Sequence, residues 1–293
     1  MKIGLFGIQV TENCKSVLNQ LVKTLIEKDA QLWIHPFFYE LFSAIQKQYK
    51  IPVEAIIQSE KIPADLNYLI TIGGDGTFLE AVSAINLQKI PLLGVNTGRL
   101  GFLADVSPGE IPEAIEALYK NEFRIEERSV IKATLFPEQN ITFPFALNDL
   151  TVHKRDTSSM IAIQAYIDDV FLSQYWADGL IIATPTGSTA YSMSAGGPIV
   201  TPDSKNFIIT PIASHNLTVR PLVIPDHHEI SLKIESRDSK FLLSLDSRSY
   251  VMEEKLEVRV KKAETNVSLV KLNNQHFYKT IRNKLMWGVD KRN

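Results

Sequence analysis

The stretch that decides the fold of the first half of this chain is a glycine-rich turn, Ile72-Gly73-Gly74-Asp75-Gly76-Thr77-Phe78. The apolar run Tyr68 to Ile72 before it is typical of a buried parallel strand, and Phe78 to Ile85 after it has the pattern of a helix. Such a turn binds phosphate groups, because its backbone N–H groups and the positive end of the helix dipole point at the anion. The stretch therefore predicts a strand–turn–helix unit with a phosphate site.

Asp75 is the unusual residue of this turn, since a carboxylate repels the phosphate that the glycines would bind. It makes sense there if it shares a cation with the phosphates or accepts a proton from an attacking hydroxyl group. This interpretation points to phosphoryl transfer, with Asp75 as the catalytic residue and a candidate metal ligand through the phosphates. The alternative is structural: a tight turn in which Asp75 is the N-cap of the helix.

The composition limits the class of protein. The 293 residues suffice for two domains, and 45% apolar and 22% charged residues are typical of a soluble globular chain. A net charge of -2 gives no electrostatic reason to expect nucleic acid or an anionic membrane as a partner. A single cysteine, Cys14, excludes an intrachain disulfide, and no apolar run reaches the roughly 20 residues of a membrane span. We therefore expect a cytoplasmic protein.

Residues 1–125 alternate between strand and helix patterns. Strands are expected at Ile3–Ile8, Gln31–Ile34, Tyr68–Ile72 and Ile90–Val95, and helices at Thr11–Lys28, Phe37–Tyr49, Phe78–Ile85 and Pro112–Tyr119. This alternation predicts an α/β domain with a doubly wound, Rossmann-like parallel sheet, in which ligands bind at the carboxyl ends of the strands.

Residues 126–275 show a different pattern, of strands separated by clusters of turn residues. Strands are expected at Ser129–Phe136, Ile161–Ile167, Glu229–Glu235, Lys255–Val260 and Val267–Leu272. This half is predicted to be a mostly antiparallel, β-sandwich-like domain. In the tail, residues 276–293, Phe277, Ile281 and Leu285 recur at helical spacing and predict an amphipathic helix that docks on a domain surface.

The densest polar segment runs from Ala177 to Pro198 and holds six serines and threonines and three glycines between Thr184 and Gly197. It offers hydroxyl and backbone donors to a polar ligand, and Tyr191 can stack on a flat ring. The apolar strand just before it would fix the position of this loop. The alternative is a structural loop with Ser/Thr turns.

Asn148 and Asp149 form a second polar pair, between two apolar runs. A carboxylate beside an amide suits a ribose diol and a base edge, whereas the structural alternative is a turn or a cap. Other mechanisms lack their motifs, because the sequence contains no Walker A G-x-x-x-x-G-K-[ST] and no G-x-G-x-x-G fingerprint.

Together these blocks resemble those of the NAD kinase family, in its bacterial type. The resemblance rests on four blocks in the family's order and spacing, Gly73–Thr77, Asn96–Leu103, Asn148-Asp149 and Asp178–Pro198. The first block is shared with diacylglycerol and sphingosine kinases, whereas the last is far more specific to NAD kinases.

The resemblance implies transfer of the γ-phosphoryl group of ATP, or of inorganic polyphosphate, to the 2′-hydroxyl of the adenosine ribose of NAD. Asp75 would accept the proton and help to hold a divalent metal, expected to be Mg²⁺. Asn148 and Asp149 would hold NAD, Thr186 and the run Thr189–Ser194 would surround the adenosine, and Asp178 would lie near the nicotinamide half. The residues thus implied to bind the substrates are Gly74, Asp75, Gly76, Thr77, Asn148, Asp149, Trp176, Asp178, Thr186, Thr189, Ala190, Tyr191, Ser192, Met193, Ser194, Ala213 and Arg248.

Three positions depart from the family's pattern. Many members carry Glu where Asp149 stands, so the contact to the ribose is one methylene shorter here. Trp176 and Arg248 stand where members vary, which leaves the preference for NAD or NADH open.

The alternative function is a lipid kinase, of the diacylglycerol or sphingosine type, that shares the glycine turn. The polar block at Asp178–Pro198 argues against it, and Asp75 argues against a third candidate, a non-catalytic dinucleotide sensor. The resemblance further implies that residues 126–275 bind NAD and form the oligomer, which we expect to be a homodimer or homotetramer with active sites shared between subunits. The apolar runs Phe207–Ile212 and Leu217–Ile224 also offer more edge than one sandwich covers.

Overall fold

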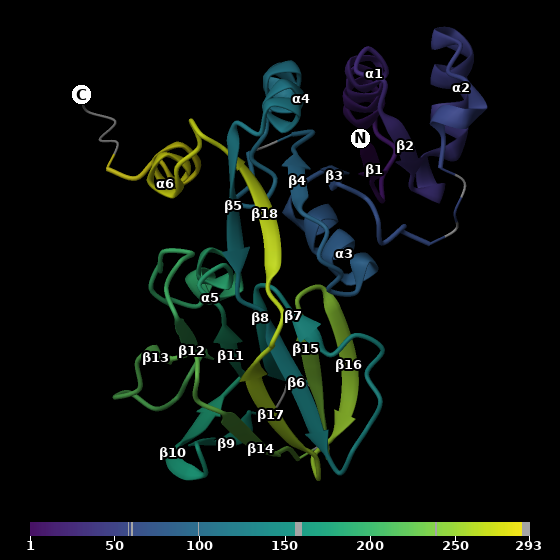
Figure 1. Cartoon of the computed structure of the whole chain (residues 1–293). Coiled ribbons are helices and arrows are strands. Elements are labelled where there is room, and N and C mark those ends of the chain that lie inside the picture. The colour runs from purple at the N-terminus through teal and green to yellow at the C-terminus, as the bar shows by residue number, and fades with distance from the viewer. Residues whose placement is uncertain (58, 60, 99, 156–159, 238, 289–293) are drawn as a thin grey trace. The chain divides into compact units, whose positions relative to one another are not determined.

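The computed structural model describes residues 1–293 except 58, 60, 99, 156–159, 238 and 289–293 (Figure 1). Arg99, in the predicted block Asn96–Leu103, therefore lies outside the described residues. The chain forms two compact units. Residues 1–127 and 268–293 make the first unit, and residues 128–267 make the second.

The first unit contains a six-stranded sheet. In the order in which they pair, its strands are β2 (Gln31–Ile34), β1 (Lys2–Phe6), β3 (Tyr68–Ile72), β4 (Leu92–Val95), β18 (Val267–Leu272) and β5 (Phe123–Arg128). The first five strands are parallel to one another. The expected doubly wound α/β fold is thereby confirmed, and the glycine turn follows β3 at the carboxyl edge of the sheet.

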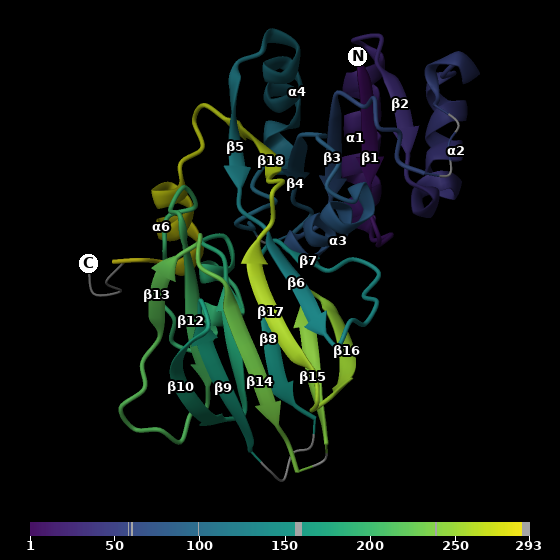
Figure 2. The same ribbon diagram turned by 60° about the horizontal axis from the view of Figure 1, so that its bottom comes forward.

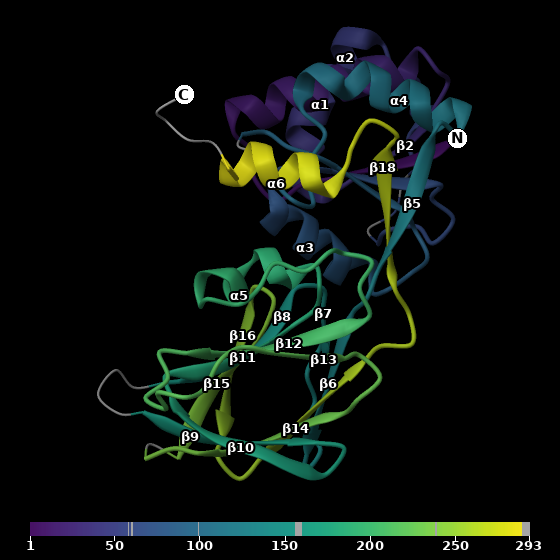
Figure 3. The same ribbon diagram turned by 90° about the vertical axis from the view of Figure 1, so that its left-hand side faces the viewer.

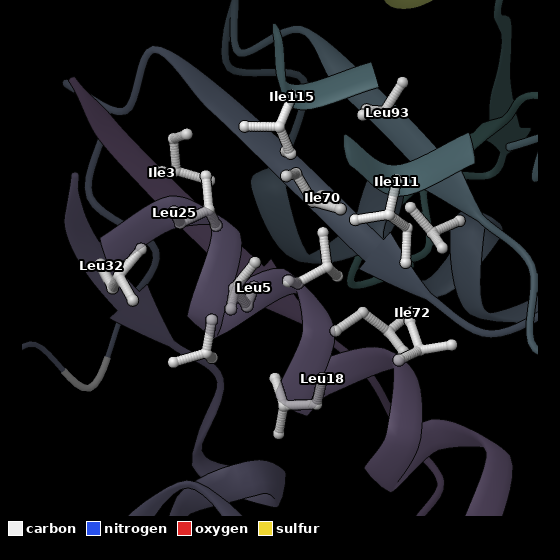
Figure 4. Packing of buried hydrophobic residues seen from close by; sticks show 14 of the residues in the cluster. Ile3, Leu5, Leu18, Leu25, Leu32, Ile70, Ile72, Leu93, Ile111 and Ile115 are labelled. Carbon is white, nitrogen blue, oxygen red and sulfur yellow. The ribbon is translucent and has the colours of Figure 1, made fainter. Parts of the chain in front are cut away.

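Helices cover both faces of this sheet, with α1 (Glu12–Ile26), α2 (Tyr39–Tyr49) and α4 (Ile111–Lys120) on one side and α3 (Asp75–Ile85) on the other (Figure 3). Ile3 and Leu5 alternate onto the first face, where they pack with Leu18 and Leu25 of α1 and Ile115 of α4 (Figure 4). Burial of such side chains stabilises the unit by about 1.5–3 kcal/mol each.

The sequence predicts Val267–Leu272 as a strand of the β-rich half, whereas in the structure this strand, β18, pairs with β4 of the first unit. Its Lys271 is buried and forms a 2.7 Å ion pair with the buried Asp105. A short apolar strand can pair with any open edge, so its pattern does not reveal which sheet it joins.

The tail beyond β18 forms helix α6 (Phe277–Leu285), close to the predicted helix. Its Phe277 ring lies 6.3 Å from the ring of Phe102. Arg124 fixes the connection to the helix, because its guanidinium donates to the carbonyl oxygens of Leu272 and Gln275.

The second unit is a sandwich of two antiparallel sheets, which Figure 3 shows edge-on and Figure 2 shows from the side of β9, β10 and β14. One sheet has the order β10 (Val170–Ala177), β9 (Ile161–Ile167), β14 (Ile230–Glu235), β17 (Glu257–Lys262), β6 (Ile131–Phe136), β7 (Phe145–Ala146). The other has the order β13 (Leu222–Pro225), β12 (Asn206–Ile212), β11 (Gly179–Ala183), β8 (Asp149–Lys154), β15 (Lys240–Leu245), β16 (Arg248–Glu253). One core, which includes Ile163, Leu232, Val152 and Leu180, joins the two layers.

The polar segment after β11 contains a 3₁₀ turn, Gly187–Thr189, and the short helix α5 (Tyr191–Ser194). Within the apolar run Leu217–Ile224, the strand β13 begins only at Leu222, because Pro221 before it has no N–H to donate to a neighbouring strand. None of the helices formed by the described residues is long and apolar enough to cross a membrane.

Candidate functional site

Asp75 is the first residue of α3, and its carboxylate is bound by a neighbouring loop of the first unit. Its Oδ2 accepts a hydrogen bond from the N–H of Phe102, and its Oδ1 accepts from the N–H groups of Leu103 and Ala104, each at 3.0 Å. The N-cap position is occupied by Gly74, so the structural alternative of Asp75 as the helix cap is wrong.

The surroundings of Asp75 favour its ionised form. Burial alone would raise the pKa of this carboxyl, but the N–H groups of residues 102–104 and the ammonium of Lys284 outweigh burial and lower it. Lys284 Nζ lies 3.3 Å from Asp75 Oδ2. Asp75 is therefore a carboxylate at neutral pH, fixed in place by three backbone donors.

The glycines keep this turn open where a ligand would approach. A Cβ on Gly74 or Gly76 would meet nothing within 4 Å, whereas a Cβ on Gly73 would lie 2.2 Å from Thr77 Oγ1. The N–H groups of the first turn of a helix have no acceptor within the helix. The first turn of α3 can therefore bind an anion, as the sequence predicts.

In the second unit, Asn148 and Asp149 are held by a carboxylate that sequence reasoning missed. Asp246 accepts hydrogen bonds from the N–H groups of Leu147, Asn148 and Asp149, at 2.9, 2.7 and 3.3 Å. Asp246 lies in the two-residue turn between β15 and β16 with φ of 51°, a conformation that Asp and Asn tolerate. The alternation of apolar and polar residues on both sides of Asp246-Ser247 is typical of a hairpin and could have indicated the turn. It could not have indicated that Asp246 binds residues 147–149.

Asp149 is a second, differently tuned carboxyl group. Burial, followed by repulsion from Asp246, raises its pKa to about 7, against the effect of a 3.3 Å hydrogen bond from Thr151 Oγ1. Asp149 is thus poised between its neutral and charged forms at physiological pH, as perturbed groups of functional sites often are.

The hydroxyl-rich segment packs directly on the Asn148-Asp149 pair. The N–H of Thr184 donates to the carbonyl oxygen of Asn148 at 2.9 Å, and Thr184 Oγ1 donates to that of Leu147 at 2.6 Å. At Gly187 a Cβ would lie 2.0 Å from the Asn148 carbonyl oxygen, so only glycine permits this approach. The structure therefore brings two of the predicted blocks together.

Within this segment the side chains divide into exposed and internal ones. Tyr191 is 44% exposed, which leaves its ring free to stack. Ser192 is fully buried and its Oγ shares a 2.8 Å hydrogen bond with Thr210. Thr186 Oγ1 accepts from the buried Arg128, a further residue that the sequence did not indicate. Partly or fully exposed are Thr189, Ala190, Met193 and Ser194.

Trp176, Asp178 and Ala213 form a separate neighbourhood. The N–H of Asp178 donates to the carbonyl oxygen of Ile212, next to Ala213, and its carboxylate forms a 2.6 Å ion pair with Lys154. Trp176 is 48% exposed. The negative charge of Asp178 is therefore balanced by the ammonium group of Lys154.

Arg248 lies instead near the Asp246 turn, where it begins β16. Its guanidinium stacks over the ring of Phe143 at 4.9 Å and donates through Nη2 to the carbonyl oxygen of Phe145. Its Nε and Nη1 are buried without a protein partner.

The described residues contain no group of three His, Cys, Asp or Glu side chains that could hold a metal ion. Asp75 offers one carboxylate, most of whose acceptor capacity is taken by backbone N–H groups. Mg²⁺ is commonly bound by one carboxylate together with substrate phosphates and waters. These residues therefore fit only a metal that arrives with phosphates.

Two family models match this chain. The model of the ATP-NAD kinase N-terminal domain matches residues 11–123, and that of the C-terminal domain matches residues 147–272. Curated NAD kinases from Cytophaga hutchinsonii and Bacteroides fragilis are 49% and 44% identical, and each alignment covers 100% of both chains. The chain belongs to the ATP-NAD kinase family and is a phosphotransferase.

Solved structures share the fold. Yeast NADH kinase, crystallised with NADH, superposes with a TM-score of 0.87 at 24% identity, covering 99% of this chain and 88% of the other. An NAD kinase from Archaeoglobus fulgidus in complex with ATP gives 0.74 at 22% identity, covering 98% and 99%. The lipid-kinase alternative is not favoured by any of these relatives.

Proposed function

We propose that this protein transfers the γ-phosphoryl group of ATP to the 2′-hydroxyl of the adenosine ribose of NAD, giving NADP. The observation that carries the proposal is the ionised Asp75 carboxylate at the first turn of α3, beside N–H groups suited to phosphates. The NADH and ATP named in the related crystal structures support the choice of substrates.

Asp75 is proposed to orient the attacking hydroxyl group and accept its proton. Its lowered pKa makes it a weak base, but phosphoryl transfer passes through a loose transition state in which positioning contributes more than base strength. Mg²⁺ bound to the donor phosphates would neutralise the charge on the transferred group, and Asp75 is the residue proposed to help hold it.

The nucleotide is proposed to bind in the second unit. Asn148 and Asp149 would hold a ribose, with Thr186 and Thr189–Ser194 around the adenosine and Tyr191 against a ring. The contacts between these two blocks support this assignment, because Asp246 and Thr184 fix the backbone of residues 147–149. Trp176, Asp178, Ala213 and Arg248 remain candidate contacts to the rest of NAD.

The product decides the function. We expect incubation with ATP, Mg²⁺ and NAD to yield the 2′-phosphate of NAD, and incubation with diacylglycerol to yield no phospholipid. Phosphorus NMR separates the two products. Formation of phosphatidate without NADP would contradict the proposed NAD kinase activity. Turnover with polyphosphate in place of ATP would change only the identity of the phosphoryl donor.

Gly101→Ala should strongly reduce turnover although residue 101 is no part of the proposed chemistry. Its Cβ would lie 2.0 Å from Asp75 Oδ1, so the carboxylate must move. Displacement of a catalytic group by about 1 Å can cost about 10²-fold in rate. Gly109→Ala is the matched control, because its Cβ would meet nothing within 4 Å and should leave kcat within twofold. Equal kcat values for both variants would show that the position of Asp75 is not critical.

We propose a homo-oligomer that acts in the cytoplasm, where the single buried cysteine would stay reduced. The edge strand β10 supports association, since its Val170, Phe171 and Trp176 are 70%, 55% and 48% exposed. If Asp178 serves a neighbour's site, mixing Asp75→Asn with Asp178→Ala subunits should restore part of the activity. Copurification through an affinity tag carried by only one of the two variants must show that mixed oligomers form, and inactive mixed oligomers would mean that each subunit is self-sufficient.

A further inference from the structure

Lys284 on α6 lies against the turn that carries Asp75. Its Nζ is 3.3 Å from Asp75 Oδ2 and 4.4 Å from the centre of the Phe102 ring. Phe102 is also one of the three residues whose N–H groups bind Asp75. The ammonium group of Lys284 therefore lies beside Asp75, the first residue of α3.

Contacts where the C-terminal segment begins fix the position of the helix that carries Lys284. The buried ion pair of Lys271 with Asp105 and the bonds from Arg124 hold the chain where α6 begins. The rings of Phe277 and Phe102 then approach each other at the first turn of the helix. The Lys284 side chain is 30% exposed, so a solute can reach it.

A structural ion pair is a poor explanation for this contact. Exposed pairs contribute about 0–1 kcal/mol, and the Asp75 carboxylate is already fixed in place by three N–H groups. A carboxylate at a phosphate turn, by contrast, needs a cation to offset its repulsion of the ligand. A lysine ammonium is a compact point charge with three donors, a common phosphate ligand in proteins.

We propose that Lys284 is a phosphate-binding residue of the phosphoryl-transfer site, which donates hydrogen bonds to the terminal phosphate of the donor. The inference rests on the proposed function and adds a residue from the C-terminal helix to it. Without donor, the ammonium pairs with Asp75. When the phosphates bind at the first turn of α3, the ammonium bridges them and the carboxylate. It thereby supplies, beside the metal proposed above, a cation from the chain itself that offsets the repulsion between Asp75 and the phosphates.

The test measures donor binding rather than turnover. We would titrate ATP, and separately inorganic tripolyphosphate, into the full chain by calorimetry without NAD or metal. Lys284→Gln and Lys284→Met keep the aliphatic stem over Phe102 but lose the charge, and Lys284→Arg keeps the charge. Lys279→Gln, an exposed position on the same helix, is the control.

We expect about 10- to 100-fold weaker binding of both polyanions to Lys284→Gln and Lys284→Met, the range for a lost charge-assisted hydrogen bond. Lys284→Arg should stay within a few-fold of the wild type, as should Lys279→Gln, and KM for NAD should not change in any variant. Unchanged or tighter binding to the two neutral variants overturns the proposal and leaves Lys284 as a partner of Asp75 alone. Weaker binding of ATP with unchanged binding of tripolyphosphate also overturns it, since the adenosine and not the phosphate would then depend on Lys284. If the wild type binds tripolyphosphate through Lys284 yet makes no NADP, the proposed function fails and the phosphate site stands.

Discussion

Asp75→Asn is expected to lower kcat by about 10²- to 10⁴-fold, the usual contribution of a positioned base, while KM for NAD changes only a few-fold. The structure adds a second reason for a large effect. Both carboxylate oxygens accept N–H bonds from residues 102–104, and an amide NH₂ would point a donor at one of these donors. Steady-state kinetics with varied NAD would separate the two parameters.

A control must distinguish lost chemistry from a displaced loop. A lowered melting temperature of Asp75→Asn would show that the loop of residues 102–104 is displaced. An unchanged affinity for NAD, measured by calorimetry, would show that the second unit is intact. Turnover near that of the wild type, with unchanged metal dependence, would mean that Asp75 serves only to fix residues 102–104.

Asp149→Ala should raise KM for NAD by about 10- to 100-fold, because in the proposed site the ribose hydroxyls would lose a charged acceptor worth roughly 1.5–3 kcal/mol. Asp149→Glu should bind NAD nearly as well, given the resemblance to members with Glu at this position. An unchanged KM in Asp149→Ala would assign the Asn148-Asp149 pair a purely structural role.

The raised pKa of Asp149 makes the stability of the fold depend on pH and, if Asp149 contacts the ribose as proposed, the binding of NAD as well. As the pH falls from 8 to 6 the carboxyl of Asp149 becomes protonated, so KM for NAD should rise over this range. The pKa of Asp149 is about 7 in the folded state and has the ordinary value of 3.8 in the unfolded state, so the folded chain binds this proton more tightly than the unfolded chain does. The stability that this proton contributes is present at low pH and lost as the pH rises toward and through 7.

Asp149→Asn should remove this dependence on pH. The melting temperature of the variant, relative to the wild type, is expected to be higher at pH 8 than at pH 5.5. The same difference at both pH values would contradict the assignment of the titration to Asp149.

The parallel sheet of the first unit could be predicted largely from the sequence, because each strand and helix there has its own period of apolar residues. Tyr68–Ile72 and Gln31–Ile34 are strands with the expected bounds. The sheet that Val267–Leu272 joins could not be predicted, since pairing between residues far apart leaves no local pattern.

The candidate site divides in the same way. The glycine turn and the hydroxyl-rich segment are continuous stretches, and their chemistry can be inferred from the residues they contain. Asp246 and Lys284 act on Asn148-Asp149 and on Asp75 from positions 97 or more residues away, so only the folded chain shows them. The shifted pKa of Asp149 likewise depends on its burial, which no spacing predicts.

The place of β18 in the first sheet determines when that sheet can be completed during synthesis of the chain. On the ribosome, residues 1–127 emerge first, yet their sheet lacks the strand between β4 and β5 until residues 128–267 have been synthesised. Until then the Asp105 carboxylate has no Lys271 to pair with, and an unpaired carboxylate cannot be buried without cost. The sheet of the first unit therefore cannot be completed before the whole second unit has been synthesised, and the same holds for the ion pair of Asp105, which directly follows the residues 102–104 that bind Asp75.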